Sequence, residues 1–184
     1  MFEKASYHLV ANGNINTEDR ELYEYGLRQG ILSIINLMTA ILIGYLLGMV
    51  WQSIIYMISY IPLRTFAGGF HTRTQFRCYL FSIYLILGVL LANRYIPGTS
   101  YNVLILTIIS CIIIICLSPV EDSNKPLDKT ERIVYRRRTI YILITEILTI
   151  ILLISLGFPT IAMSISISLF ALCFMLILGS IKIR

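Results

Sequence analysis

The sequence predicts an all-α membrane protein that crosses the bilayer several times. Of its 184 residues, 57% are hydrophobic and only 14% are charged, and the mean hydropathy is +0.80. Soluble domains carry about 45–50% apolar and about 25% charged residues. The apolar residues are also grouped, because no charge interrupts Tyr101 to Ser118 and only Glu146 interrupts Thr139 to Leu178. This composition excludes a disordered chain, a collagen-like fibre and an ordinary cytosolic domain.

The first predicted element is an amphipathic helix over residues 17–30. Thr17 can cap it, and acidic residues follow in the first turn, where the helix dipole favours them. Tyr23, Leu27 and Ile31 then recur at helical spacing. We expect this helix to lie on the membrane surface, run into the first hydrophobic segment and anchor the chain; binding a partner is the alternative.

Residues 31–61 form an uncharged hydrophobic segment. About 20 residues cross a bilayer core of about 30 Å, so this segment is too long for one upright helix and short for two. We interpret it as a short helix pair that turns near Gly48–Gln52, with Trp51 at the interface. One tilted helix followed by a re-entrant piece is the alternative. A polar loop is expected over residues 62–78.

Two further helix pairs are predicted over residues 79–118 and 139–179, separated by a basic loop over residues 119–138. The last pair is expected to turn at Gly157-Phe158-Pro159. Helices are expected because an unpaired backbone group in lipid costs several kcal/mol. A β-barrel would need an alternating pattern, which these apolar runs lack. The chain therefore reads as one domain of about six membrane spans, with four spans plus re-entrant pieces as the alternative.

The distribution of charge orients these helices. In the six-span arrangement, all of the 15 Lys and Arg residues except Arg94 lie on one side of the membrane. Cytoplasmic loops are enriched in these residues, so both termini and the loop over residues 62–78 are expected in the cytoplasm. The net charge of +5 then follows from topology and does not indicate a nucleic-acid partner.

Cysteine usage indicates neither a disulfide framework nor a metal site. Three of the four cysteines, Cys111, Cys116 and Cys173, lie in apolar runs, where cysteine behaves as a small hydrophobic residue. Cys78 alone lies beside polar residues. A structural zinc site needs four N or S ligands, and the sequence gathers only His71 and Cys78. We therefore expect no metal and no other cofactor.

The loop over residues 62–78 carries the candidate chemistry. Cationic groups near Cys78 favour its nucleophilic thiolate form, and His71 is the natural base. Seven residues span about 10.5 Å along a straight helix, whereas a nucleophile and its base need about 3 Å. The chain must therefore fold back, as Gly68-Gly69 permits, or the pair must meet across a dimer. A polar loop without catalysis is the alternative.

The order Arg64-x2-Ala67-Gly68-Gly69-x-His71-x6-Cys78, placed after a short hydrophobic pair, resembles the accessory gene regulator B (AgrB) family. A second match is the run from Pro119 to Pro126, followed by Glu131, a basic triplet and two closing helices. The resemblance covers essentially the whole chain. Each motif alone is weak, and their order, spacing and membrane setting make the resemblance specific.

The resemblance implies a membrane-embedded cysteine endopeptidase of Gram-positive quorum sensing, whose partner is an AgrD-like autoinducer propeptide. His71 and Cys78 match the catalytic pair, and Arg64 and Gly69 match positions needed for activity. Cys78 would form a thioester while releasing an acidic tail, and a propeptide thiol or hydroxyl would displace Cys78 to close a thiolactone or lactone ring.

The supporting roles around this pair follow from general chemistry. Backbone N–H groups at Gly68 and Gly69 could stabilise the oxyanion. Arg64 could bind a substrate carboxylate or support the loop. Glu121 or Asp122 could orient His71 if the loops meet, and a solvated charge is the alternative for both.

The basic residues in and near the predicted loop over residues 119–138 could have two roles. They could contact the acidic tail of the propeptide or anionic lipid, or they could only set topology. These residues are Lys125, Lys129, Arg136, Arg137 and Arg138. Glu146 is expected to reach toward Arg138 rather than to act in catalysis.

The partners expected are the propeptide, the lipid bilayer and a second copy of the chain in a homodimer. Two other functions remain open from the residues alone, a small membrane transporter or peptide exporter and a non-catalytic membrane scaffold.

Overall fold

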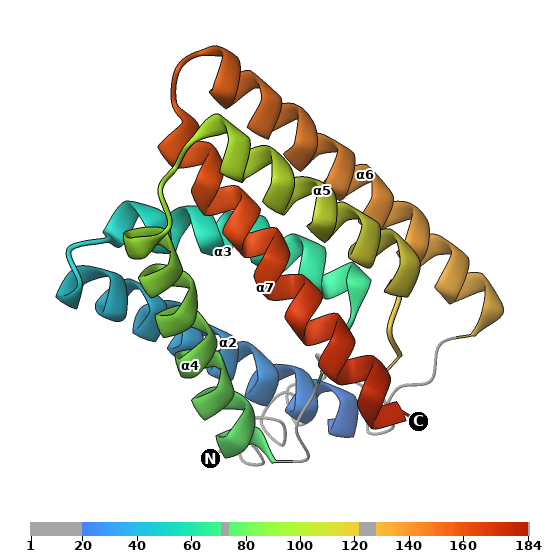
Figure 1. The fold of residues 1–184 in the computed structure, drawn as a ribbon. Coiled ribbons are helices and arrows are strands. Elements are labelled where there is room, and N and C mark those ends of the chain that lie inside the picture. The colour runs from blue at the N-terminus through green and yellow to red at the C-terminus, as the bar shows by residue number, and fades with distance from the viewer. Residues whose placement is uncertain (1–19, 71–73, 122–127, 184) are drawn as a thin grey trace.

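The computed structural model describes residues 20–70, 74–121 and 128–183, which are helical with short connections and contain no strand (Figure 1). The predicted all-α class is confirmed. The six helices are α2 (Arg20–Leu46), α3 (Val50–Ala67), α4 (Gln75–Tyr95), α5 (Ser100–Leu117), α6 (Lys129–Ser155) and α7 (Pro159–Ile183).

Four of these helices, α4 to α7, are long and apolar enough to cross a membrane, whereas the apolar part of α2, Gly30–Leu46, is shorter. Helix α3 completes a compact pair with α2 rather than adding a fifth candidate span. Within the described residues, the arrangement is therefore four candidate spans and a shorter hydrophobic pair, closest to the alternative stated above. These apolar helices make the chain a multi-pass membrane protein.

The turn between α2 and α3 lies where the sequence predicted it. Gly48 has a φ of +67°, a conformation that glycine adopts without steric cost. The two helices approach closely beyond the turn, because a Cβ on Gly44 would lie 2.7 Å from the Ser53 Cβ. The Ser53 hydroxyl also donates a hydrogen bond of 2.7 Å to the Ala40 carbonyl. Small residues thus allow a tight pair.

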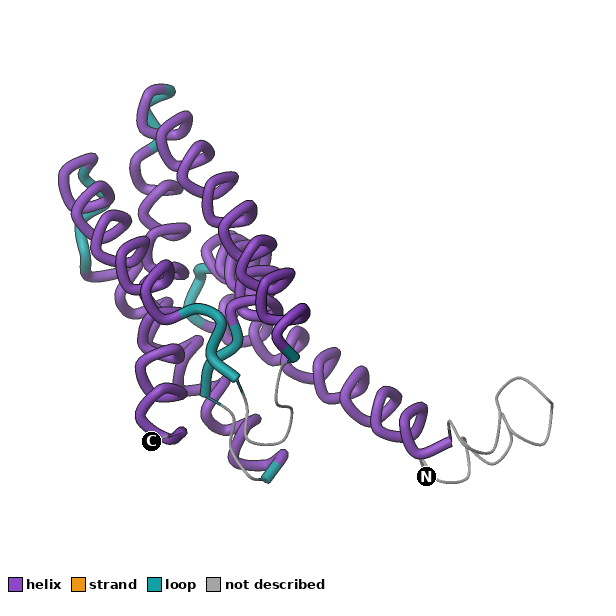
Figure 2. Tube along the Cα trace, turned by 90° about the vertical axis from the view of Figure 1, so that its right-hand side faces the viewer, coloured by secondary structure: helices purple, strands orange, loops and turns teal. Residues whose placement is uncertain are grey.

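Helix α2 is continuous from Arg20 to Leu46, so the predicted surface helix runs into the first apolar segment without a break. Residues 17–19 of that prediction lie outside the described residues. Figure 2 shows the N-terminal part of α2 extending away from the other helices.

The prediction that residue 62 begins a loop is wrong, because α3 continues to Ala67 with Pro62 inside it. A proline inside a helix removes one backbone hydrogen bond and disfavours the preceding turn. Packing outweighs this cost here, since Leu63 is 1% exposed and Ala67 is fully buried. The real connection begins at Gly68, and Cys78 lies within α4, which starts at Gln75.

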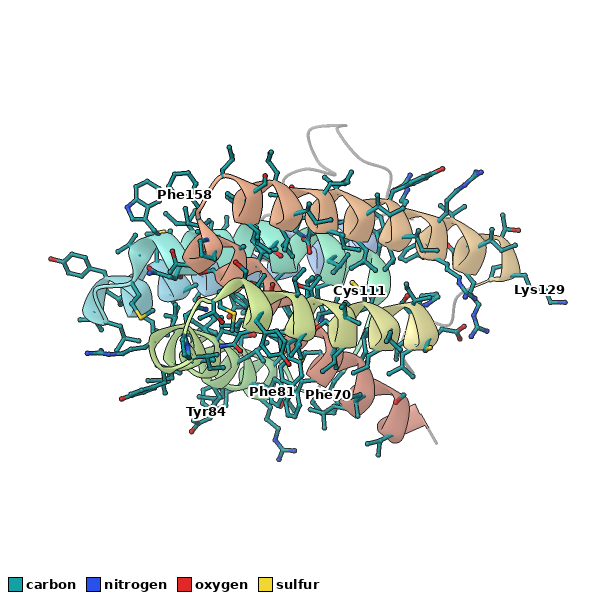
Figure 3. All side chains as sticks on the ribbon, turned by 45° about the horizontal axis from the view of Figure 1, so that its top comes forward. Phe70, Phe81, Tyr84, Cys111, Lys129 and Phe158 are labelled. Carbon is teal, nitrogen blue, oxygen red and sulfur yellow. The ribbon has the colours of Figure 1, made fainter. Side chains whose placement is uncertain are left out.

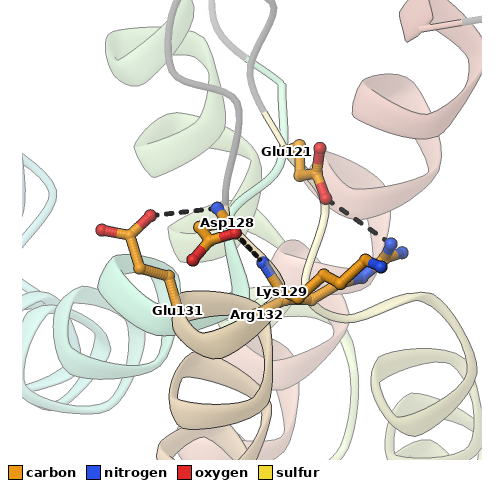
Figure 4. A network of polar contacts seen from close by, with 5 residues as sticks. All are labelled: Glu121, Asp128, Lys129, Glu131 and Arg132. Atoms are coloured by element: carbon orange, nitrogen blue, oxygen red, sulfur yellow. Dashed lines mark hydrogen bonds and ion pairs between the residues drawn. The ribbon is translucent and has the colours of Figure 1, made fainter.

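The predicted loop over residues 119–138 is also shorter than expected, because α6 begins at Lys129. The Asp128 carboxylate accepts a hydrogen bond of 2.7 Å from the Lys129 N–H, and the Glu131 carboxylate accepts one of 3.2 Å from the Asp128 N–H (Figure 4). This capping box satisfies backbone donors at the helix start. The basic triplet therefore lies on a helix and not in a loop.

Helix α7 is the centre of the bundle. Inside the chain, 72% of its apolar stretch is buried, against 17–22% for α4, α5 and α6. Its buried serines link it to its neighbours, because Ser166 shares a hydrogen bond of 2.8 Å with Thr107 of α5 and Ser164 donates one of 2.7 Å to Asn93 of α4. Such contacts between membrane helices are each worth about 0.6–2 kcal/mol. The turn before α7 lies at Gly157, as predicted.

The α4–α5 connection meets the start of α7 at Gly98, and this contact supplies a stability test. A Cβ on Gly98 would lie 2.8 Å from the Thr160 Cα, so Gly98→Ala must displace backbone. Overpacking of this kind costs about 1–3 kcal/mol. We expect Gly98→Ala to lower the midpoint of thermal unfolding, followed by circular dichroism in detergent micelles.

Gly30→Ala is the matched control for this experiment. A Cβ on Gly30 meets no atom within 4 Å, and alanine favours the helix over glycine by about 1 kcal/mol. Gly30→Ala should leave the midpoint unchanged or raise it. Equal losses in the two variants would contradict the close contact at Gly98.

Candidate active site

The connection that follows α3 is held between two distant parts of the chain. Gly68 pairs with Val120 in an isolated parallel bridge, and the Val120 N–H donates a hydrogen bond of 2.9 Å to the Ala67 carbonyl. The Phe70 N–H donates another of 2.9 Å to the Met175 carbonyl of α7. Backbone groups from α7 and from the segment after α5 therefore fix the path of this connection directly before His71.

The path is so narrow that only glycine fits at its two bends. Gly68 has a φ of +73° and Gly69 a φ of +127°, both disfavoured for other residues. A Cβ on Gly68 would collide with the Val120 carbonyl, and one on Gly69 would lie 2.6 Å from Arg64 Nη1 and 3.1 Å from the Met175 carbonyl oxygen. Steric contacts and backbone conformation thus explain why residues 68 and 69 are both glycine.

Gly179 is a third glycine of this site, and sequence reasoning missed it. It lies on α7, and a Cβ there would come within 2.8 Å of the Gly69 carbonyl carbon and of the Phe70 nitrogen. A lone glycine in an apolar helix is a known signal for a close approach of backbone. The signal was present in the sequence, but nothing there identified the loop as the partner.

Arg64 holds the end of this connection from α3. Its Nη2 donates a hydrogen bond of 2.6 Å to the Phe70 carbonyl. Its Nη1 is buried beside Gly69 and has no hydrogen-bond partner among the described residues. The guanidinium therefore supports the connection through Nη2 and places its Nη1 donor beside Gly69.

Cys78 lies in the first turn of α4 and is half-buried. Its backbone N–H donates a hydrogen bond of 3.1 Å to the Thr74 carbonyl. Its thiol is close enough to the Tyr60 hydroxyl of α3 for the two to interact electrostatically, and Tyr60 interacts in the same way with Arg64. Tyr60, which was not predicted, is therefore within electrostatic range of both Cys78 and Arg64.

His71 lies outside the described residues, so its pairing with Cys78 stays a prediction. The residue before it, Phe70, is fixed by Arg64 and by Met175. Its ring lies 5.5 Å from that of Phe81 on α4, and the Phe81 ring lies 6.5 Å from that of Phe174 on α7, measured between centroids (Figure 3). The aromatic contacts join α4 and α7 close to Cys78.

The basic start of α6 packs beside the end of α3. The Arg138 guanidinium lies 5.1 Å above the Phe66 ring, a cation–π contact, and the Tyr135 ring meets the same ring edge-on at 5.8 Å. Lys129 and Arg136–Arg138 are exposed, and Lys125 lies outside the described residues. Part of the predicted basic surface therefore adjoins the connection that carries Gly68 and Gly69.

Two acidic residues have partners other than those predicted for them. The carboxylate of the half-buried Glu121 lies 3.6 Å from the guanidinium of the exposed Arg132, a surface ion pair of small energetic value (Figure 4). Glu146 accepts a hydrogen bond of 3.0 Å from the Ser59 hydroxyl of α3. Arg138 is engaged with Phe66, so the structure places Glu146 with Ser59 and not with Arg138.

Comparisons with known proteins identify the family of the chain. The family model of Accessory gene regulator B matches residues 2–176. An AgrB-like protein of Clostridium perfringens strain SM101 is 28% identical over 169 residues, covering 84% of this chain and 76% of the relative. AgrB-like protein 2 of C. perfringens strain 13 is 25% identical over 169 residues, with the same two coverages.

No solved structure matches the chain. The family match extends from the N-terminal segment through Cys78 and the basic triplet and into α7, so it includes the two segments that the fold brings together around Gly68. This chain belongs to the AgrB family, whose membership indicates a part in accessory gene regulator quorum sensing.

Proposed function

We propose that this chain is a membrane-embedded cysteine endopeptidase that cleaves the C-terminal part of an AgrD-like autoinducer propeptide. The observation that carries the proposal is the close packing that fixes the α3–α4 connection, where Gly68 pairs with Val120 and the Phe70 N–H bonds the Met175 carbonyl, shortly before Cys78 in the first turn of α4. Arg64 holds the Phe70 carbonyl, so the residue before the proposed base His71 is fixed on both sides of its backbone. Family membership supplies the propeptide as the substrate class.

The proposed reaction has two acyl transfers. The Cys78 sulfur, deprotonated by His71, attacks the carbonyl carbon of the peptide bond. The carbon–nitrogen bond breaks, the amine of the tail takes the proton from His71, and a thioester on Cys78 remains. A thiol or hydroxyl of the propeptide then attacks that thioester, the carbon–sulfur bond breaks, and Cys78 regains a proton as a thiolactone or lactone ring closes.

Several features of the described residues support these steps. The Gly68 N–H, one of the predicted oxyanion donors, already bonds the Arg64 carbonyl at 3.2 Å, and the Phe70 N–H bonds the Met175 carbonyl. An oxyanion would therefore need other donors, among them Arg64 Nη1, which has no hydrogen-bond partner within the described residues. The site lies at the end of apolar helices, where exclusion of water would protect the thioester from hydrolysis.

The topology proposed for the chain places this site in the cytoplasm, with both termini, because Lys and Arg gather at that end. The exposed basic residues at the start of α6 would then attract an acidic tail or anionic lipid. The proposed assembly is a homodimer, in which His71 and Cys78 pair within one chain or across the interface.

The first test removes the nucleophile. We expect Cys78→Ala to abolish propeptide processing while leaving membrane insertion intact. The intact mass of the purified wild-type chain, incubated with an AgrD-like propeptide, should rise by the mass of the peptide without its tail, and hydroxylamine should reverse the rise. Cys116→Ala, which changes an exposed cysteine of α5, is the control and should behave as the wild type. Unchanged processing by Cys78→Ala would refute the proposal.

The second test separates the two roles of Arg64. Arg64→Lys removes the fork that contacts both Phe70 and Gly69. If Arg64 positions the loop, kcat for thioester formation should fall at least about tenfold with little change in KM. A rise in KM at constant kcat would instead assign Arg64 to the binding of a substrate carboxylate. Thr65→Ala is the control, since the Thr65 hydroxyl donates a hydrogen bond to the Ile61 carbonyl of its own helix.

The third test concerns the narrow path at Gly69. Gly69→Ala should lower kcat strongly, because the new methyl group would displace Arg64 Nη1 and the Met175 carbonyl, and because a φ of +127° strains alanine. Thioester formation measured by intact mass reports the loss. Wild-type rates in this variant would show that the path of the connection is not needed for the reaction.

A further inference from the structure

A hydrogen bond joins α2 to α4 directly beside Cys78. The Tyr79 hydroxyl of α4 lies 2.9 Å from the Thr39 hydroxyl of α2, and the two helices cross in Figure 1. Neither hydroxyl has a part in the reaction proposed above. Because Tyr79 is the residue after Cys78, the contact acts on the turn of α4 that carries the thiol.

The protons of the two hydroxyls show which of them donates. A hydroxyl has a single proton, and that of Thr39 is donated to the Ile35 carbonyl at 2.8 Å. The Tyr79 hydroxyl is therefore the donor in the bond to Thr39. A phenol whose proton is engaged in this way has none to offer to an oxyanion or to a leaving amine. The geometry thus gives Tyr79 the role of holding α4 rather than that of touching a substrate.

Helix α2 bonds both helices that flank the α3–α4 connection. Thr39 bonds Tyr79 of α4, and the carbonyl of the next residue, Ala40, accepts the hydrogen bond of 2.7 Å from Ser53 of α3. Ser53 and Ala40 are buried, and Thr39 and Tyr79 are half-buried. Polar contacts shielded from bulk water are stronger than exposed ones. Helix α2 therefore holds α4 against α3 independently of the connection itself.

Cys78 lies between two anchors on the surface of α4. Residues on a helix follow one another by about 100°, so Tyr79 lies about 100° to one side of Cys78 and Phe81 about 60° to the other. Tyr79 is bonded to α2, whereas the Phe81 ring packs against Phe70 of the connection and Phe174 of α7. A rotation of α4 that turned the thiol in either direction would have to break one of these contacts.

We propose that Thr39 and Tyr79 are positioning residues of the peptidase, and that their hydrogen bond fixes the direction in which α4 presents the Cys78 thiol. The inference rests on the proposed function, and it gives α2, expected from the sequence to anchor the chain, a part in the reaction. A displacement of a reacting group by about 1 Å costs up to about a hundredfold in rate. The loss of one contact beside the nucleophile is therefore expected to appear in kcat.

The test removes each hydroxyl separately and then both together. Tyr79→Phe and Thr39→Val keep the shape of the side chain, and each should lower kcat for thioester formation by about tenfold to a hundredfold with little change in KM. Thr39→Ser keeps the hydroxyl and should retain the wild-type kcat. The double variant should lose no more than either single one, because both substitutions remove the same contact. The midpoint of thermal unfolding, followed by circular dichroism in detergent micelles, shows that each variant is folded.

Two matched controls remove hydroxyls elsewhere. Tyr84→Phe changes a tyrosine of α4 that is 69% exposed. Thr145→Val changes a threonine of α6 whose hydroxyl donates to the Tyr141 carbonyl of its own helix, as that of Thr39 does within α2. Both controls should keep the wild-type kcat and KM. Losses as large as those of Thr39→Val would assign the effect to any missing hydroxyl and overturn the proposal.

The other outcomes separate positioning from its alternatives. A wild-type kcat in Tyr79→Phe, or equal kcat in Thr39→Ser and Thr39→Val, would overturn the proposal. A loss in Tyr79→Phe alone would also overturn it, because Thr39→Val leaves the Tyr79 O–H free and the tyrosine would then act on the substrate directly. A wild-type chain that forms no thioester would refute the peptidase itself, whereas a wild-type thioester together with unaffected variants would refute only the positioning role.

Discussion

The structure depends on one constraint, the passage of the α3–α4 connection through a gap that admits only backbone. Ala67 and Phe70 are hydrogen-bonded to Val120 and Met175. The chain segments approach so closely here that residues 68, 69 and 179 have no room for a Cβ atom. Two hydrogen bonds and three missing Cβ atoms thus determine where the chain emerges before His71. Arg64 adds a charge-assisted bond to the same segment, stronger than a neutral one.

Helix α7 makes this constraint possible because, among the candidate spans of the described residues, it alone is buried over most of its length. One end presents the Met175 carbonyl and Gly179 to the connection, and its Phe174 ring stacks on Phe81 of α4. Its serines bond Thr107 and Asn93 across the bundle. Between membrane helices the hydrophobic effect supplies little attraction, so such packing and polar contacts hold the helix in place. A connection supported in this way is fixed by the core and not by its own residues.

Local patterns predicted much of the fold and part of the site. The absence of charge located the helices, and Gly48 and Gly157 located two turns, because these features act over a few residues. The end of α3 and the start of α6 were predicted wrongly, for different reasons. Pro62 reads as a helix end, yet burial of Leu63 and Ala67 carries the helix past it. The capping box at Asp128 and Glu131 was present in the sequence, but the dense basic charge around it suggested a loop.

The sequence by itself determined that the chain is a helical membrane protein, that Cys78 is its one polar-flanked cysteine, and that Arg64, Gly68 and Gly69 share a segment with it. Only the tertiary structure decided what those residues touch. Tyr60, Val120, Met175 and Gly179 are brought to the site from α3, from the segment after α5 and from α7. Contacts between residues this distant along the chain arise from helix packing. A local sequence pattern does not indicate which helices pack against each other.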